Sequence, residues 1–155
     1  MIRPAQPADL SALGQLGATL MRVHYAFDPL RFITPHEDAA KGYASFLGSM
    51  LRDPESVVFV AEENGGIAGY VFAALEPMSW KELRGPAGFV HDLVVVEHAR
   101  RAGIATALMQ AALTWLREHG APRVVLGTAA KNVAAQTLFK RLGFRETMVE
   151  MTLEL

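Results

Sequence analysis

The stretch Arg100-Arg101-Ala102-Gly103-Ile104-Ala105 follows an apolar run and precedes a segment with helical spacing. A strand that turns into a helix through small residues leaves several backbone N–H groups unpaired, at the end of the helix where its dipole favours negative charge. Gly103 permits a left-handed backbone there, and the two arginines add positive charge. The stretch therefore predicts a phosphate-binding turn; on these residues alone, a solvated corner that simply starts a helix is the alternative.

Two common phosphate-binding loops are absent from the chain. No Gly-Lys-Ser/Thr is found, as a nucleoside triphosphatase requires, and no Gly-x-Gly-x-x-Gly, as a dinucleotide-binding turn requires. A different phosphate compound is therefore expected at this turn.

The segments on both sides of the turn predict a mixed α/β sheet flanked by helices. Before the turn, hydrophobic spacing predicts helices at 7–21 and 39–51 with a proline-containing loop between them, then a hairpin of strands at 56–61 and 67–75, then a strand at 89–96. After the turn it predicts a helix that ends before Gly120, a strand at 123–128, a helix at 133–141 and a final strand at 147–155. No strand is expected ahead of the first helix.

Composition sets the outer limits on function. A chain of 155 residues, 51% of them hydrophobic, predicts one domain over 1–155. With 15 basic and 16 acidic residues, no overall field favours nucleic acid or an anionic membrane. The absence of cysteine excludes disulfides and zinc–thiolate sites and fits a reducing compartment. No signal peptide or apolar span is seen, so we expect a cytoplasmic protein with neither a membrane nor a metal as partner.

The turn and three other segments resemble the GNAT superfamily of N-acetyltransferases. Residues 100–105 meet the family signature Arg/Gln-x-x-Gly-x-Gly/Ala at every defining position. Residues 2–5 and 8–10 are similar to the start of the family, and Asn132-x-x-Ala135-x-x-Leu138-Phe139-x-x-Leu142-Gly143-Phe144 is similar to its second motif. The resemblance covers nearly the whole chain. It implies the family's fold, in which two adjacent parallel strands splay apart to hold coenzyme A.

The resemblance also implies acetyl-coenzyme A as co-substrate. In the family the end of the central strand pairs with the pantetheine arm, the amides of the turn hold the pyrophosphate, and an asparagine meets the arm. The corresponding residues here are Leu93, Val94, Val95, Arg100, Arg101, Ala102, Gly103, Ile104, Ala105, Thr106 and Asn132. For Asn132 a helix N-cap is an alternative role, and one residue could serve both.

The implied reaction is transfer of an acetyl group to a primary amine of a small molecule or peptide, by direct attack without a covalent intermediate. Holding an amine of pKa about 10.4 deprotonated at pH 7 costs about 4–5 kcal/mol, so a base is expected. The candidates are His91 and Glu76, each with a purely structural alternative, a satisfied strand histidine and a loop-edge carboxylate. Strand alternation predicts that His91 and Asp92 lie on opposite faces, so that at most one faces the acceptor.

One residue departs from the family pattern. The family often has a tyrosine seven positions after the asparagine, as proton donor to the departing thiolate, and this chain has Phe139. Either the thiolate leaves unaided, which a thiol pKa of about 8.5 makes tolerable, or another group donates. The substitution keeps open a second hypothesis, a coenzyme A-binding regulator without catalysis. A hydrolase has no support, since neither Gly-x-Ser-x-Gly nor His-Glu-x-x-His is present.

A polar and aromatic cluster occupies the region that the family uses for acceptor recognition. Its members are His24, Tyr25, Asp28, Arg31 and Phe32, and a role as loop anchors is the alternative to substrate binding. The identity of the amine is left open. Members of the superfamily often dimerise, and the sheet edge near the C-terminus offers a surface, so a homodimer is a further expectation.

Overall fold

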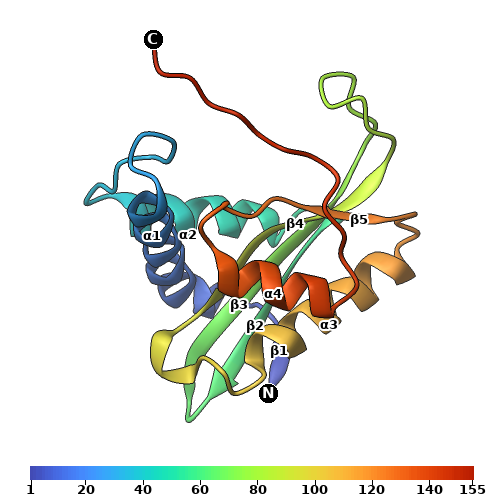
Figure 1. Ribbon diagram of the computed structural model, residues 1–155. Coiled ribbons are helices and arrows are strands. Elements are labelled where there is room, and N and C mark those ends of the chain that lie inside the picture. Colours follow the sequence, from blue (N-terminus) through green and yellow to red (C-terminus); the bar gives the residue numbers. More distant parts are fainter.

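The computed structural model describes residues 1–155, which form a five-stranded sheet in the order β1-β2-β3-β4-β5 with helices on both faces (Figure 1). The strands are β1 (Ile2–Pro4), β2 (Ser56–Glu63), β3 (Gly66–Glu76), β4 (Ala87–Val95) and β5 (Val124–Leu126). The helices are α1 (Leu10–Phe27), α2 (Ala39–Met50), α3 (Ile104–Glu118) and α4 (Val133–Arg141), with short 3-10 turns η1 (Pro7–Asp9) and η2 (Glu97–Ala99). Only β4 and β5 pair in parallel. The predicted mixed sheet is confirmed.

The sheet is covered on both faces, and β3 shows this directly. Val71 and Ala73 belong to the core beneath α3 and α4, whereas Tyr70 and Phe72 belong to the core beneath α1 and α2. Successive side chains of a strand point to opposite faces, so a strand buried on both reads as one continuous apolar run. None of the helices combines the length and hydropathy that crossing a bilayer requires.

Two sequence-based expectations about strands are wrong. A strand does precede the first helix: Arg3 of β1 pairs with Val60 of β2, and three residues are too few to show the alternation that reveals a strand. The strand expected at 147–155 does not form. These residues extend away from the body of the protein (Figure 1), with Val149, Met151 and Leu153 exposed, because no strand of the same chain lies beside them.

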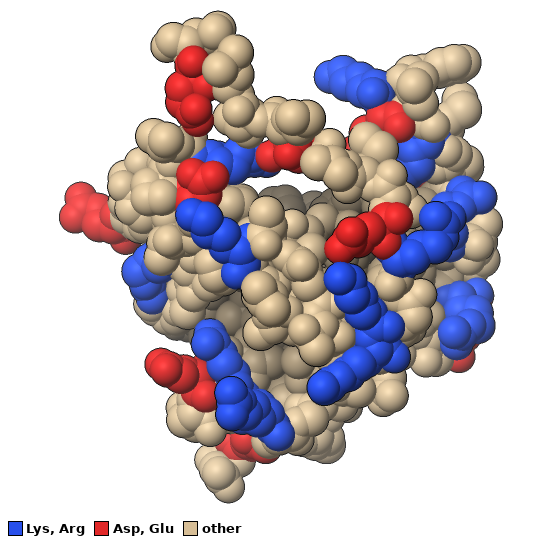
Figure 2. Space-filling model, in the orientation of Figure 1, with Lys and Arg blue, Asp and Glu red and all other residues tan.

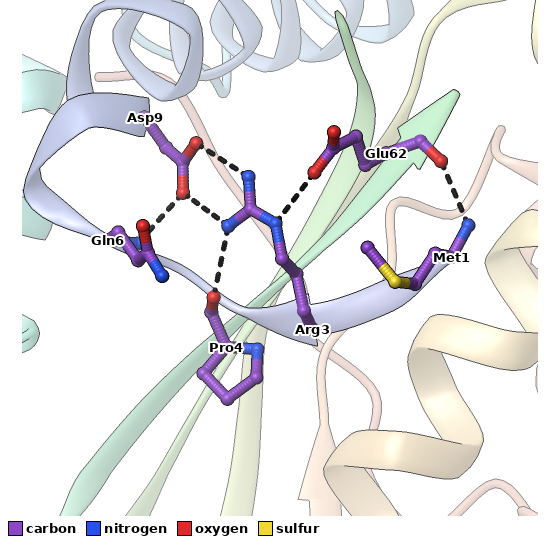
Figure 3. A network of polar contacts seen from close by, with 6 residues as sticks. All are labelled: Met1, Arg3, Pro4, Gln6, Asp9 and Glu62. Carbon is purple, nitrogen blue, oxygen red and sulfur yellow. Dashed lines mark hydrogen bonds and ion pairs between the residues drawn. The ribbon is translucent and has the colours of Figure 1, made fainter. Parts of the chain in front are cut away.

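Arg3 ties β1 to β2 and to the start of α1 (Figure 3). Its Nη1 and Nη2 atoms donate to the Asp9 carboxylate at 2.8 and 3.0 Å, and its Nε donates to Glu62 at 2.7 Å. Asp9, only 8% exposed, also accepts from the Gln6 amide at 2.8 Å. The hydrogen bonds from Arg3 hold the pKa of the Asp9 carboxyl below its ordinary value. The network therefore stabilises the fold only while Asp9 is ionised.

Replacing Asp9 with Asn should cost about 2–3 kcal/mol of unfolding free energy at pH 7, the scale of charge-assisted hydrogen bonds. Because the folded pKa of Asp9 is depressed, this advantage is present above the ordinary carboxyl pKa of about 4 and is lost as pH falls through the folded value. Urea unfolding of both proteins from pH 7 to pH 3 measures the difference. Glu118→Gln, at an exposed position, is the control and should give a small difference at every pH. If the unfolding free energies of Asp9→Asn and the unaltered protein differed by the same amount at every pH, the depressed pKa of Asp9 would be contradicted.

Candidate active site

Beyond its first residues, β4 has an open edge. It pairs with β5 only at Gly88, Phe89 and Val90, and the two strands then diverge. On the other side the Val96 amide donates to the Ala68 carbonyl near the start of β3. Since the backbone groups of an antiparallel strand alternate between its two sides, those of Val95 and Leu93 point away from β3, into the gap. An extended, amide-containing ligand could pair with them there.

The turn after β4 forms a cradle of free amides at the start of α3. Arg101 and Gly103 both have left-handed backbones, with φ of 67° and 80°. The amides from Arg101 to Thr106 donate to no acceptor within the chain, and the first helical bond here runs from Ala107 to Gly103. Successive free N–H groups at a helix N-terminus favour an anion such as a phosphate.

Charged side chains lie around this cradle. Figure 2 shows basic side chains gathered over the loop between β4 and α3. The Arg100 Nε donates to the Val95 carbonyl at 3.2 Å, which keeps that side chain beside the open edge. Asn132 caps α4, accepting from the Ala135 amide at 3.1 Å, so its capping role is present in the structure.

A cavity of about 820 Å³ lies on the α1 and α2 face of the sheet, at the other end of the open edge. Its apolar wall includes Met21, Tyr43, Phe46, Met50, Phe72 and Leu75. Its polar lining includes His91 and Asp92 of β4 and Glu76 of β3. The volume is in the range of small-molecule sites.

A β-bulge at His91 brings both β4 residues into this cavity, which corrects the expectation that His91 and Asp92 face opposite sides. Phe72 of β3 pairs with Asp92, and the next residue, Ala73, pairs with Val90, so His91 has no opposite partner. An extra residue shifts the alternation of every later residue. As a result Val90 faces the α3 core while Asp92, two residues on, faces the cavity.

His91 and Glu76, the two predicted catalytic residues, are in direct contact. The His91 Nε2 lies 2.8 Å from Glu76 Oε1, and the two side chains are 34% and 32% exposed. The imidazole is stacked between the rings of Phe72 and Phe89, at centroid distances of 5.0 and 4.6 Å. With Nε2–H donated to the carboxylate, Nδ1 is left as an acceptor, the arrangement of an oriented general base.

Asp92 is a lining residue whose carboxyl group is largely removed from solvent. Tyr70, itself fully buried, donates its hydroxyl to Asp92 Oδ2 at 3.0 Å. Burial raises the pKa of the Asp92 carboxyl, although the Tyr70 hydrogen bond opposes the shift. Burial also raises the pKa of Tyr70, so its hydroxyl stays protonated as a donor. A cation entering the cavity would find a carboxylate poorly solvated by water, where charge pairing is strong.

The five predicted acceptor residues lie outside the cavity lining. His24 bonds the Leu20 carbonyl and packs edge-on against Phe32. Asp28 accepts from the Leu30 amide, and Arg31 lies over the Phe32 ring and pairs with Glu150. Tyr25 is half-buried on α1. The contacts of this cluster hold the loop between α1 and α2.

Sequence reasoning did not identify two cavity residues, Tyr43 and Phe72, or the buried Tyr70, which bonds the cavity residue Asp92. Tyr70 and Phe72 read as ordinary members of an apolar strand, and their face became known only with the sheet register. The Tyr43 ring packs directly against Gly17 of α1, where a Cβ would come within 2.3 Å of the ring. Phe139, by contrast, packs edge-on against Phe144 at 5.9 Å in the α3 core and carries no proton to donate.

Relatives by sequence are acetyltransferases. The chain is 29% identical to the uncharacterized N-acetyltransferase YhfO of Bacillus subtilis over 147 residues, which are 94% of this chain and 89% of YhfO. It is 34% identical to an N-alpha-acetyltransferase of Sulfurisphaera tokodaii over 110 residues, which are 67% of this chain and 65% of that protein.

Solved structures agree on the fold. A predicted acetyltransferase of Clostridium acetobutylicum, crystallised with acetyl-CoA, superimposes with a TM-score of 0.76 at 20% identity, over 99% of this chain and 95% of that one. Residues 20–144 match the acetyltransferase (GNAT) family. This match spans most of the sequence and includes both the amide cradle and the bulged strand. The chain belongs to the GNAT family of acetyltransferases.

Proposed function

We propose that the protein transfers an acetyl group from acetyl-coenzyme A to a primary amine by direct attack. The observation that carries the proposal is that one strand, β4, joins two sites. Its open edge leads to the amide cradle, and its bulge presents a histidine–carboxylate pair to a cavity of small-molecule size. Saturable binding of acetyl-coenzyme A by calorimetry, together with coenzyme A release over a panel of amines, tests it.

The residues proposed for the co-substrate have the chemistry it requires. Leu93, Val94 and Val95 form the strand end beside the gap, where the backbone groups of Leu93 and the N–H of Val95 face the arm; the Val95 carbonyl already accepts from Arg100. The amides from Arg101 to Thr106 suit a pyrophosphate. Arg100 and Arg101 add positive charge for a further phosphate, and Asn132 lies at the start of α4. When bound, the thioester supplies an acyl group already activated toward an amine.

The acceptor half of the reaction needs a base, and His91 is proposed for it. Its Nδ1 is the free acceptor when Nε2 donates to Glu76, and the Glu76 carboxylate would stabilise the imidazolium that forms. Glu76 is thus proposed as a positioning residue. Stacking between Phe72 and Phe89 keeps the imidazole ring in one orientation. Because the ring is already oriented, the reaction does not have to pay the entropic cost of orienting it.

The alternative is a coenzyme A-binding regulator, motivated by Phe139. It predicts tight binding of acetyl-coenzyme A without turnover over the whole amine panel. The His91–Glu76 pair favours catalysis, since a regulator needs no oriented base in a cavity beside its ligand.

Gly103→Asp should weaken binding of acetyl-coenzyme A by about 100-fold or more, because a carboxylate would stand beside the amides that hold the pyrophosphate. Gly120→Asp is the matched control. Gly120 lies just beyond the other end of α3 with φ of 81°, and a Cβ at either position meets no atom within 4 Å. Both variants should lose roughly 1–2 kcal/mol of stability to left-handed strain. Calorimetry should show weakened binding for Gly103→Asp alone; equal affinities would argue against the cradle.

His91→Ala should lower kcat/KM by about 100-fold or more at pH 7 with the best amine of the panel, the usual scale of general-base catalysis. The loss should shrink toward alkaline pH, where more of the amine is free. His119→Ala is the control, since His119 is also stacked on an aromatic ring, Trp115, and donates one hydrogen bond to the Trp115 carbonyl, but lies outside the cavity. A loss for His91→Ala that stays constant across pH would contradict the base role.

We propose in addition that the protein forms a homodimer through its C-terminal tail, residues 147–155. Val149, Met151 and Leu153 share one side of an extended chain by alternation, and all are exposed. Strand β5 lies at the edge of the sheet. The tail of one copy would add to that edge in the other, which pairs both sets of backbone groups and buries the apolar side.

Light scattering should give a dimer mass for the full chain and a lower mass, or a weaker dimer, for Met151→Asp. Thr152→Asp is the control, since residue 152 points to the opposite side of the tail and should leave the dimer intact. A monomer mass for the unaltered chain at tens of micromolar would contradict the proposal.

A further inference from the structure

The lining of the cavity has an unusual balance of charge. Four carboxylate side chains belong to it, those of Asp53, Glu55, Glu76 and Asp92, and no lysine or arginine does. Half of the lining residues are hydrophobic. The lining also includes two histidines, His36 and His91, so the cavity combines an apolar wall with four carboxylates and with no ammonium or guanidinium group.

The carboxylates differ in the hydrogen bonds that they already make within the protein. Asp53 accepts from the Glu55 amide at 2.9 Å and from the Ser56 hydroxyl at 3.3 Å, as part of the turn before β2. Glu76 bonds His91, and Asp92 bonds Tyr70. The Tyr70 hydroxyl supplies no positive charge to Asp92, and no lysine or arginine of the lining does so, so the Asp92 carboxyl can pair with an amine.

Two arginines close to lining residues, Arg84 and Arg31, are committed elsewhere. Arg84 donates to the carbonyl of the lining residue Pro77, but its Nε is paired with Glu82 at 2.9 Å. Arg31 precedes the lining residue Ile33 by two positions and is paired with Glu150. Neither guanidinium faces the cavity as a free partner for an anion.

The walls beside these carboxylates are aromatic. The ring of Phe46 packs edge-on against that of Phe72 at 5.6 Å, and Phe72 in turn stacks on His91. Tyr43 completes this side of the cavity. The apolar part of an amine substrate would be buried against these walls. The aromatic faces would also attract the amine in its ammonium form, before it is deprotonated.

We propose that the acceptor is a small primary amine on an apolar or aromatic body that carries no carboxylate or phosphate. This inference rests on the proposed acetyl transfer and narrows its substrate. An amino acid bears a carboxylate on the carbon next to the amine, so it would bring a further carboxylate beside Asp92 and Glu76, in a cavity whose lining has no arginine or lysine to receive it. Like charges brought together in a desolvated site discriminate strongly against such a ligand.

Amines and amino acids that differ only by the carboxylate test the proposal. The pairs are 2-phenylethylamine with phenylalanine and 3-methylbutylamine with leucine, assayed by coenzyme A release at saturating acetyl-coenzyme A. We expect kcat/KM to be higher for the amine by about 100-fold or more in each pair. Phenylalanine amide, in which the carboxylate is replaced by a neutral group, should recover most of the difference. Equal use of amine and amino acid would overturn the proposal.

A charge reversal on the lining gives a second test. Glu55 is exposed at the cavity and outside the proposed catalytic pair. Glu55→Lys should narrow the preference for phenylethylamine over phenylalanine at least about fivefold, since it places a cation where an anion can meet it. Glu63→Lys, the same change at the far end of β2, should leave the preference unaltered. A preference unchanged by Glu55→Lys would contradict the charge argument.

Failure of this inference is distinguishable from failure of the proposed function. If acetyl-coenzyme A neither binds nor is turned over with any amine, the proposed acetyl transfer is wrong. If it binds and amino acids or phosphorylated amines are used as well as simple amines, only the acceptor class is wrong. If a peptide N-terminus is used better than every small amine, the small-molecule part is overturned. If acetyl-coenzyme A binds but the simple amines are neither acetylated nor bound in calorimetry, the acceptor class is overturned too.

Discussion

Strand β4 contains one residue more than the part of β3 that it pairs with, and the position of that residue organises the site. Because His91 is the extra residue, both it and Asp92 face the cavity, although adjacent residues of a regular strand face opposite ways. The same shift turns the backbone groups of Leu93 and Val95 toward the open edge. One bulge therefore positions the proposed acceptor site and the proposed co-substrate site relative to each other.

The open edge is costly for a folded protein unless something occupies it. Backbone N–H and C=O groups in a sheet are normally paired, yet β5 pairs with only three residues of β4. Directly beyond, the amides at the start of α3 are also unpaired. A ligand with an amide-rich arm and a pyrophosphate would satisfy both sets in one binding event. Acetyl-coenzyme A has both parts, and for this reason the backbone carries more of the proposed binding than the arginines do.

Local signals predicted most of the fold. The hairpin at Asn64, the bounds of α4 and the left-handed Gly103 follow from turn chemistry and periodicity. Features that depend on a neighbouring strand could not be predicted from these local signals. The bulge at His91 has no marker in the sequence, since it is defined by what β3 leaves unpaired, and alternation consequently placed Asp92 on the wrong face. The strand expected at 147–155 has the right alternation but no partner in its own chain.

The magnitudes of the two proton transfers explain how a site with Phe139 can still be catalytic. A departing thiolate of pKa about 8.5 is only about 2 kcal/mol from its protonated form at pH 7, whereas an amine of pKa about 10.4 must give up about 4–5 kcal/mol to become nucleophilic. A protein with one well-oriented base therefore gains more by acting on the amine than on the thiolate. In this chain the imidazole of His91, bonded to Glu76, lies at the cavity proposed for the acceptor, while position 139 is buried in the opposite core. If His91 is the base, as proposed, the phenylalanine at position 139 removes only the smaller contribution, protonation of the thiolate, and leaves the larger one, deprotonation of the amine, in place.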